Sequence, residues 1–155
     1  MVNVTYTSGG ARLLNRVAPL WEELNKQHLD LSPYFKDYYN SLKFEDRKQV
    51  ILHRAIGGEV RVDIALDTAD FLVGSCISSI DCELTGQIDF IFVTKCFRNR
   101  GVGTKLMEKA LEWLKSKGSK KNIASVAVGN EQTYAFYAQF GFFPRRTLLE
   151  QKKHS

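Results

Sequence analysis

The sequence has 155 residues, of which 44% are hydrophobic and 25% are charged. This composition is typical of a soluble globular protein and argues against a disordered, collagen-like or membrane-spanning chain. The net charge of +5 is uneven: residues 1–80 hold 9 Lys and Arg against 10 Asp and Glu, whereas residues 81–155 hold 13 against 7. We therefore expect an anionic ligand, either nucleic acid or a phosphorylated cofactor, in the C-terminal half.

Cysteine usage and the first residues bear on localisation. Cys76, Cys82 and Cys96 lack CxxC spacing, which predicts neither a disulfide framework nor a zinc knuckle. The segment 1–7 lacks the basic and apolar regions of a secretory signal. We expect a cytoplasmic protein with a single domain over residues 1–155.

The N-terminal part predicts one strand and two helices. Alternating residues predict a strand over 2–7, and apolar residues at helical spacing predict a helix over 13–24. Pro19 either kinks that helix or marks its start. Ser32 followed by Pro33 is typical of a helix N-cap and first turn. They predict a second, broken helix with segments 33–42 and 45–56.

Three strands at 60–66, 71–80 and 87–93 are predicted next, and their short turns favour an antiparallel meander. A period of two along 87–93 divides the residues between two faces. One face is predicted to hold Gln87, Asp89, Ile91 and Val93, and the other Ile88, Phe90 and Phe92.

The remaining elements alternate between helix and strand. An amphipathic pattern predicts a helix over 102–117, followed by a strand over 123–128. A short aromatic helix over 131–140 and a last strand over 142–150 complete the prediction. The fold class is therefore α/β, with a sheet that is antiparallel at first and then extended by a crossover.

A glycine-containing loop at 98–104 separates a strand from a helix. Its glycines allow close approach of a ligand, and the first N–H groups of the helix are free to bind an anion such as pyrophosphate. Arg98 and Arg100 add positive charge. The order of Gly103, Thr104 and Lys105 does not match a P-loop, and a dinucleotide fingerprint requires glycine where Leu106 stands.

The loop resembles motif A of the GNAT superfamily of N-acetyltransferases, Arg/Gln-x-x-Gly-x-Gly/Ala, whose fixed positions are filled by Arg98, Gly101 and Gly103. A second segment resembles motif B of the same family, Asn-x₅-Phe-Tyr-x₃-Gly-Phe. Its residues are Asn130, Phe136, Tyr137, Gly141 and Phe142, with Thr133 where the family often has Ala. The two motifs together cover about residues 87–143.

The resemblance implies a GNAT-like fold: a mixed, mostly antiparallel sheet with helices on both faces and an N-terminal helix pair. It also implies strands that splay around 87–93 and 123–128, and acetyl-CoA as the cofactor. The cofactor-binding residues that it implies are Ile91, Phe92, Val93, Arg98, Asn99, Arg100, Gly101, Val102, Gly103, Thr104, Asn130 and Tyr137.

Acetyl transfer to a primary amine by direct attack, through a tetrahedral intermediate, requires three tasks. The resemblance assigns polarisation of the thioester carbonyl to a backbone N–H at a bulge near Val93. It assigns protonation of the departing thiolate to Tyr137, since a phenol with a pKa of about 10 holds its proton at neutral pH. Alternatively, Tyr137 is a packing residue, and Asn130 a helix N-cap that also contacts the cofactor.

The base is harder to assign. Several family members carry a carboxylate where Gln87 stands, and glutamine cannot accept a proton. Asp89 is predicted on the same face and would act through a water, although a surface or ion-paired role is an equal alternative. The catalytic residues expected are therefore Tyr137 and Asp89.

His28, Tyr34 and Tyr38 are candidates for contact with the acceptor amine, because they follow the first helix, where the family's substrate loop lies. At helical spacing such aromatic residues also suit a core. The three histidines, His28, His53 and His154, show no metal-ligand spacing, so no metal is expected.

Other functions remain open at this point. A non-catalytic acyl-CoA-binding sensor is the main alternative, favoured by Gln87. Nucleic-acid binding through Lys115, Lys117, Lys120 and Lys121 is disfavoured, because no aromatic residues interleave with these lysines. The predicted last strand offers an edge to a partner, so a homodimer is a candidate.

Overall fold

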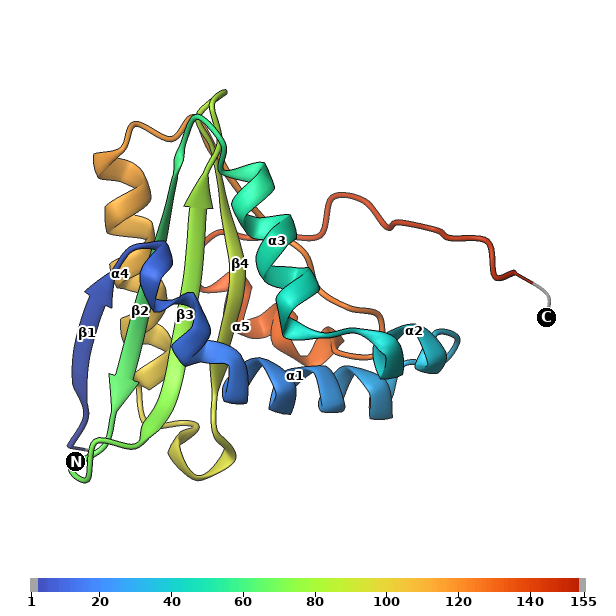
Figure 1. The fold of residues 1–155 in the computed structure, drawn as a ribbon, viewed down its shortest axis with the longest axis horizontal. Helices are drawn as coiled ribbons and strands as arrows, with labels where there is room; N and C mark the ends of the chain where they lie inside the picture. The colour runs from blue at the N-terminus through green and yellow to red at the C-terminus, as the bar shows by residue number, and fades with distance from the viewer. Residues whose placement is uncertain (1–2, 154–155) are drawn as a thin grey trace.

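The computed structural model describes residues 3–153, which contain one five-stranded sheet with helices on both faces (Figure 1). The strand order is β1-β2-β3-β4-β5, antiparallel except for the parallel pair β4–β5. The mixed, mostly antiparallel sheet is therefore confirmed. The strands are β1 (Thr5–Gly9), β2 (Glu59–Leu66), β3 (Leu72–Ile80), β4 (Thr85–Val93) and β5 (Lys121–Ala124). Val2, in the predicted strand 2–7, lies outside the described residues.

One face of the sheet is covered by the N-terminal helices. The 3₁₀ helix η1 (Ala11–Val17) leads into α1 (Ala18–Leu31), and α2 (Lys36–Ser41) and α3 (Phe44–Arg54) follow. Pro19 lies in the first turn of α1, where its missing N–H costs no hydrogen bond, so it marks the start of this helix. Apolar side chains from η1, α1 and α3 pack here against β2, β3 and β4.

The predicted N-cap at Ser32 is wrong. Ser32 directly follows the last residue of α1, and its Oγ accepts a hydrogen bond from the Phe35 N–H at 3.0 Å. This local bond holds a turn between the helices, so α2 begins only at Lys36.

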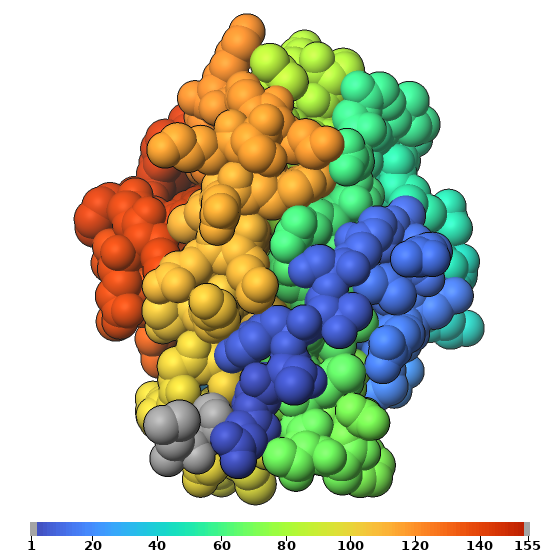
Figure 2. Space-filling view, turned by 90° about the vertical axis from the view of Figure 1, so that its left-hand side faces the viewer, coloured from blue at the N-terminus to red at the C-terminus, as the bar shows by residue number. Residues whose placement is uncertain are grey.

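The opposite face is covered by α4 (Val102–Ser116). Its apolar stripe is buried against the sheet through Val102, Leu106, Met107, Ala110 and Leu114. In Figure 2, α4 lies beside the N-terminal strand, where Lys109 Nζ is 5.7 Å from the Tyr6 ring centroid. The amphipathic pattern thus located this helix correctly, because an apolar stripe of this width needs a sheet to cover it.

Strand β4 contains a bulge that the sequence did not predict. Ile77 of β3 pairs with Phe90, but Ser78 pairs with Ile88, which leaves Asp89 as the extra residue. Because one extra residue reverses the alternation, Ile88 packs with α4 whereas Phe90 packs with the N-terminal helices. The predicted division of 87–93 into two continuous faces is therefore wrong.

The C-terminal elements are shorter than predicted. β5 ends at Ala124, and a 3₁₀ helix η3 (Glu131–Thr133) precedes α5 (Tyr134–Ala138). The predicted strand at 142–150 is wrong, because this segment pairs with no strand among residues 3–153. Instead, residues 143–153, here called the C-terminal arm, run outward past α2 (Figure 1). Pro144 lacks the N–H that a strand at this position needs.

Candidate functional site

The second half of β4 has a free edge. Its pairing with β5 ends at the pair Ile88 and Ala124, and within residues 3–153 no strand continues it along Asp89–Val93. The Thr94 N–H donates to the Val73 carbonyl at 2.9 Å, toward β3. Because successive residues of a strand alternate, the N–H and C=O groups of Ile91 and Val93 point to the free side. The predicted separation of the strands is confirmed, whereas the bulge lies at Asp89 rather than near Val93.

A second group of free backbone donors lies just beyond β4. A short 3₁₀ helix η2 (Lys95–Phe97) leads into the loop, and Gly101 adopts a left-handed conformation (φ +83°) directly before α4. The first amide of α4 to find an acceptor is that of Lys105, which donates to the Gly101 carbonyl at 3.0 Å. The N–H groups of residues 99–104 have no acceptor in the described part of the chain.

This loop has the properties of an anion-binding cradle. A Cβ placed on Gly101 would meet no atom within 4 Å, so the space before the helix is open. The free amides and the positive end of the 15-residue helix α4 both favour negative charge there. The residues present therefore fit a pyrophosphate group, by their own geometry.

The two arginines of the loop stack on aromatic rings. Arg98 Nε donates to the Val93 carbonyl at 2.8 Å, and its guanidinium lies 5.1 Å from the Phe92 ring centroid. The Arg100 guanidinium lies 5.9 Å from the Phe97 ring centroid. Arg98 thus lies across the free end of β4, which joins the loop to the open strand edge.

Gly103 marks where the loop, β4 and α5 meet. A Cβ at this position would lie 3.4 Å from Phe136 Cε1 and 3.7 Å from Val93 Cγ2. Motif A and motif B residues, distant in sequence, are therefore adjacent in the structure.

Tyr137 lies in the aromatic cluster around α5, with its ring centroid 5.7 Å from that of Phe142. Burial, and to a lesser degree the nearby Cys76 thiol, raises the pKa of Tyr137 well above its ordinary value. The phenol therefore stays protonated at neutral pH. Its hydroxyl makes no hydrogen bond to any group within residues 3–153.

Asn130 connects the loop before α5 to α1. Its side-chain oxygen accepts hydrogen bonds from Gln27 Nε2 at 3.0 Å and from Gln132 Nε2 at 2.6 Å. Although Asn130 holds the N-cap position of η3, its side chain does not cap that helix. Gly129 permits this approach, because a Cβ there would clash with the Leu31 carbonyl. The partnership with Gln27 gave no signal in the sequence.

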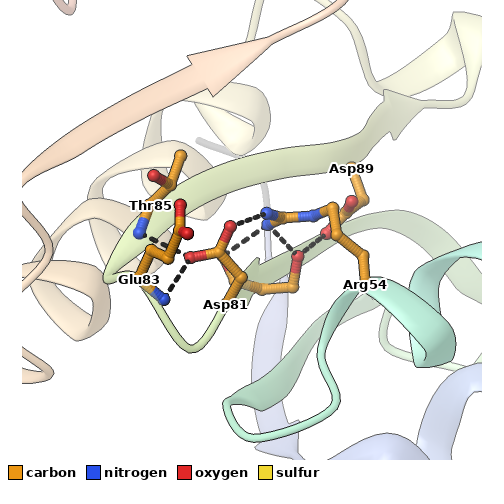
Figure 3. A network of polar contacts seen from close by, with 6 residues as sticks. Arg54, Asp81, Glu83, Thr85 and Asp89 are labelled. Atoms are coloured by element: carbon orange, nitrogen blue, oxygen red, sulfur yellow. Dashed lines mark hydrogen bonds and ion pairs between the residues drawn. The ribbon is translucent and has the colours of Figure 1, made fainter.

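Asp89 lies in a closed polar network below α3 (Figure 3). Its Oδ2 accepts a hydrogen bond from Ser79 Oγ at 2.6 Å, and Ser79 Oγ accepts one from Arg54 Nη2 at 2.6 Å. Arg54 Nη1 also binds Asp81 Oδ2 at 3.2 Å, and Arg47 Nη2 lies 3.9 Å from Asp89 Oδ1. Only 1% of the Asp89 side chain is exposed.

The pKa of Asp89 is raised, mainly by burial. The hydrogen bond from Ser79 and the charges of Arg47 and Arg54 oppose this shift without cancelling it. The carboxylate is thus a stronger base than an exposed aspartate, but one that is largely closed to water. Sequence reasoning identified Asp89 and missed the three partners, which come from α3 and β3.

The structure connects two of the three candidate acceptor residues through Tyr39. The Tyr39 ring centroid lies 5.5 Å from that of His28 and 5.1 Å from that of Tyr38. Burial lowers the pKa of His28, which favours the neutral imidazole. Tyr34 is 68% exposed and lines, with Tyr38 and Lys152, a hollow of about 210 Å³.

A larger hollow of about 550 Å³ lies between α1 and the segment that joins α2 to α3. Trp21 and Tyr39 line it, as do the carboxylates of Glu22 and Glu45. Residues 3–153 contain no group of three or more side chains that could hold a metal ion; His154 lies outside this range. None of the helices described combines the length and apolar character needed to cross a bilayer.

Comparisons with known proteins identify the family. The sequence matches the Acetyltransferase (GNAT) family over residues 19–142. It is 30% identical over 131 residues to an uncharacterized N-acetyltransferase of Methanocaldococcus jannaschii, covering 77% of this chain and 58% of that protein. It is 31% identical over 83 residues to N-alpha-acetyltransferase 30 of Schizosaccharomyces pombe, covering 51% and 55%. The chain thus spans a little over half the length of these relatives.

Solved structures agree with this assignment at the level of the fold. An acetyltransferase of the GNAT family from Staphylococcus aureus has a TM-score of 0.66 at 15% identity, covering 89% of this chain and 83% of that one. The structure of AAC(6')-Iy with a CoA-containing bisubstrate analog has a TM-score of 0.62 at 20% identity, covering 99% of both chains. The chain belongs to the GNAT acetyltransferase family.

Proposed function

We propose that this protein is an N-acetyltransferase that moves an acetyl group from acetyl-CoA to a primary amine by direct attack on the thioester. The observation that carries the proposal is the set of unpaired backbone groups at the end of β4. Ile91 and Val93 face a free strand edge, and the adjacent amides of residues 99–104 have no acceptor within the described chain. Unpaired groups gathered in one place favour a ligand that supplies both acceptors and negative charge.

The proposed cofactor contacts follow from this geometry. The loop amides from Asn99 to Thr104 would bind the pyrophosphate, with Arg100 adding charge at the same end. The backbone groups of Ile91 and Val93 would bind the amide-containing arm of the cofactor as an added strand would. Phe92 and Arg98 support this edge through their stacking, and Asn130 holds the loop that faces it.

The transfer requires stabilisation of negative charge on the carbonyl oxygen. The Val93 N–H points to the free side of β4 and is the donor that we assign to this task. When the amine attacks, the carbon–sulfur bond breaks and the sulfur leaves as a thiolate. Tyr137, protonated because of its raised pKa, would then donate its proton to that sulfur.

Asp89 is the proposed acceptor of the amine proton, through a water that reaches Oδ1. Its raised pKa supports this role, because a base is most effective when its pKa approaches the working pH. Its enclosure by Ser79 and Arg54 limits access, so its replacement by Asn tests the assignment directly. If Asp89→Asn is as active as the parent at neutral pH, the amine loses its proton to solvent instead.

The acceptor would enter near the end of α1, where His28, Tyr34 and Tyr38 lie around Tyr39. Two of the curated relatives are N-alpha-acetyltransferases, which makes peptide N-terminal amines the first acceptors to test. The exposed free thiols of Cys82 and Cys96 fit a reducing compartment and thus the cytoplasmic location that we propose.

The decisive experiment measures thiol release from acetyl-CoA over a panel of amines that includes peptide N termini, polyamines and aminoglycosides. The proposal requires thiol release that depends on one class of amine and yields the acetylated amine by mass spectrometry. Tight binding of CoA without thiol release for any of these amines would favour a non-catalytic acyl-CoA sensor. Gln87, where several relatives carry a carboxylate, is the feature that favours this alternative.

A further inference from the structure

The C-terminal arm is extended and has no partner in its own chain. The Phe142 N–H donates to the Tyr137 carbonyl at 3.1 Å, but no residue from 143 to 153 makes a hydrogen bond or ion pair to another described residue. The arm nevertheless carries large apolar side chains. Phe143 is 72% exposed, and Leu148 and Leu149 are each 88% exposed. Apolar residues gathered on an extended segment are typical of an interaction surface.

The sheet offers a matching unpaired edge. β5 is the last strand in the sheet order and pairs only with β4, so its other edge is free among the described residues. Ile123 within β5 is 36% exposed, and Val128 shortly after it is 50% exposed. A free edge beside exposed apolar side chains favours addition of another strand.

One antiparallel register matches the arm to this edge in both charge and hydrophobicity. If Glu150 lies opposite Lys121, then Leu149 lies opposite Asn122 and Leu148 opposite Ile123. The same alignment thus pairs opposite charges and two apolar side chains on one face.

The geometry of the arm favours a second copy over its own sheet. Pro144 fixes its own backbone and restricts Phe143 to extended conformations, so the chain is held straight where it leaves α5. Figure 1 shows it running outward, away from the strands. An extended segment of this length reaches up to about 36 Å. Since each copy has one arm and one free edge, a two-fold exchange satisfies both at once.

We propose that the C-terminal arm adds as an antiparallel strand to the free edge of β5 in a second copy of this chain, forming a two-fold exchanged dimer. This inference does not depend on acetyl transfer, and its tests require no activity.

The first test measures mass by size-exclusion chromatography with light scattering across a dilution series. The wild-type protein is expected at twice the protomer mass. Replacing both leucines with Asp (Leu148→Asp and Leu149→Asp) should weaken the dimer by at least about 100-fold, since four buried leucines are lost per dimer. Gln151→Asp introduces the same kind of charge at a polar position and should change the dissociation constant by less than about threefold. A wild-type monomer at every concentration overturns the proposal.

The second test distinguishes exchange from an arm folded on its own sheet. In a background where Cys82 and Cys96 are serine, one preparation carries Leu148→Cys and another carries Ile123→Cys. After the two are mixed and oxidised, a disulfide between different copies supports the exchange. A single chain with both substitutions that forms only an internal disulfide, while the mixture forms none, overturns it.

Discussion

The two halves of β4 carry different kinds of polar group. In the first half, the strand is paired on both edges, and the Asp89 carboxylate at its end is held by Ser79 and enclosed by Arg54. In the second half, one edge is free, and the loop that follows leaves the amides of residues 99–104 without acceptors. The bulge at Asp89 lies at the boundary between the two halves.

This contrast separates groups that hold the fold from groups that are available to a ligand. A buried polar group with all of its partners contributes stability and gains nothing from a ligand. A free amide at the start of a long helix costs little in water and binds an anion strongly. Changes in the second half should therefore alter binding and catalysis, whereas changes in the first half should alter stability.

The largest effect is expected for Tyr137→Phe, which removes one hydroxyl and keeps the ring in its aromatic cluster. Since general acid catalysis typically contributes about 10²–10⁴-fold, kcat should fall within that range while acetyl-CoA affinity stays nearly constant. Tyr134→Phe in the same helix is the matched control, because Tyr134 is 40% exposed. A loss below about threefold, with chemistry rate-limiting, would make Tyr137 a packing residue.

Gly103→Asp should give the next largest effect, on binding. It places a carboxylate at the first turn of α4, where repulsion of the phosphates should weaken CoA binding by about 100-fold in calorimetry. Gly103→Ala separates charge from size, because its Cβ would make only a 3.4 Å contact with Phe136. If the Asp variant bound CoA as tightly as the Ala variant, the cradle would lie elsewhere.

Neighbouring serines of β3 test the first half of the comparison through stability. Ser79→Ala removes the hydroxyl between Arg54 and Asp89, and should lower the free energy of unfolding by about 1–3 kcal/mol. Ser78 is equally buried, but its Oγ has no hydrogen-bond partner among the described residues, so Ser78→Ala should be neutral or stabilising. Urea denaturation of both variants measures the difference. Equal losses would show that the Ser79 network contributes nothing specific.

The smallest effect is a pH dependence. Because the pKa of Asp89 in the folded protein is raised above its ordinary value of 3.8, the folded state binds this proton more tightly than the unfolded state. The free energy of unfolding should therefore fall as the pH rises from about 4 through the raised pKa. Asp89→Asn lacks this titration, so the stability of wild type relative to the variant should decline over that window. A constant difference across it would contradict the raised pKa.

Local patterns were sufficient to predict much of the fold and the loop. The apolar stripe of α4, the alternation of β2 and the glycines around Gly101 act through neighbours in sequence, so they could be interpreted without the structure. The bulge at Asp89 could not, because a one-residue shift depends on the pairing of two strands. The same holds for Asn130, whose partner Gln27 lies 103 residues away.

Two errors have a common cause. Ser32 was predicted to cap α2, and residues 142–150 were predicted as a strand, from residue types that suit those roles. Ser32 instead holds the turn after α1, and the C-terminal arm finds no edge in its own chain. Residue type indicates what a segment can do, whereas the neighbouring elements decide whether it does so.

The central claim is that the free edge of β4 and the loop amides form the acetyl-CoA site. Titration of the ¹⁵N-labelled protein with CoA, followed by amide chemical shifts, tests it directly. The account predicts the largest shifts at residues 99–104, Ile91 and Val93, with little change at Ser79 and Asp81. Shifts confined to the hollow between α1 and α2, with the loop amides unchanged, would contradict it.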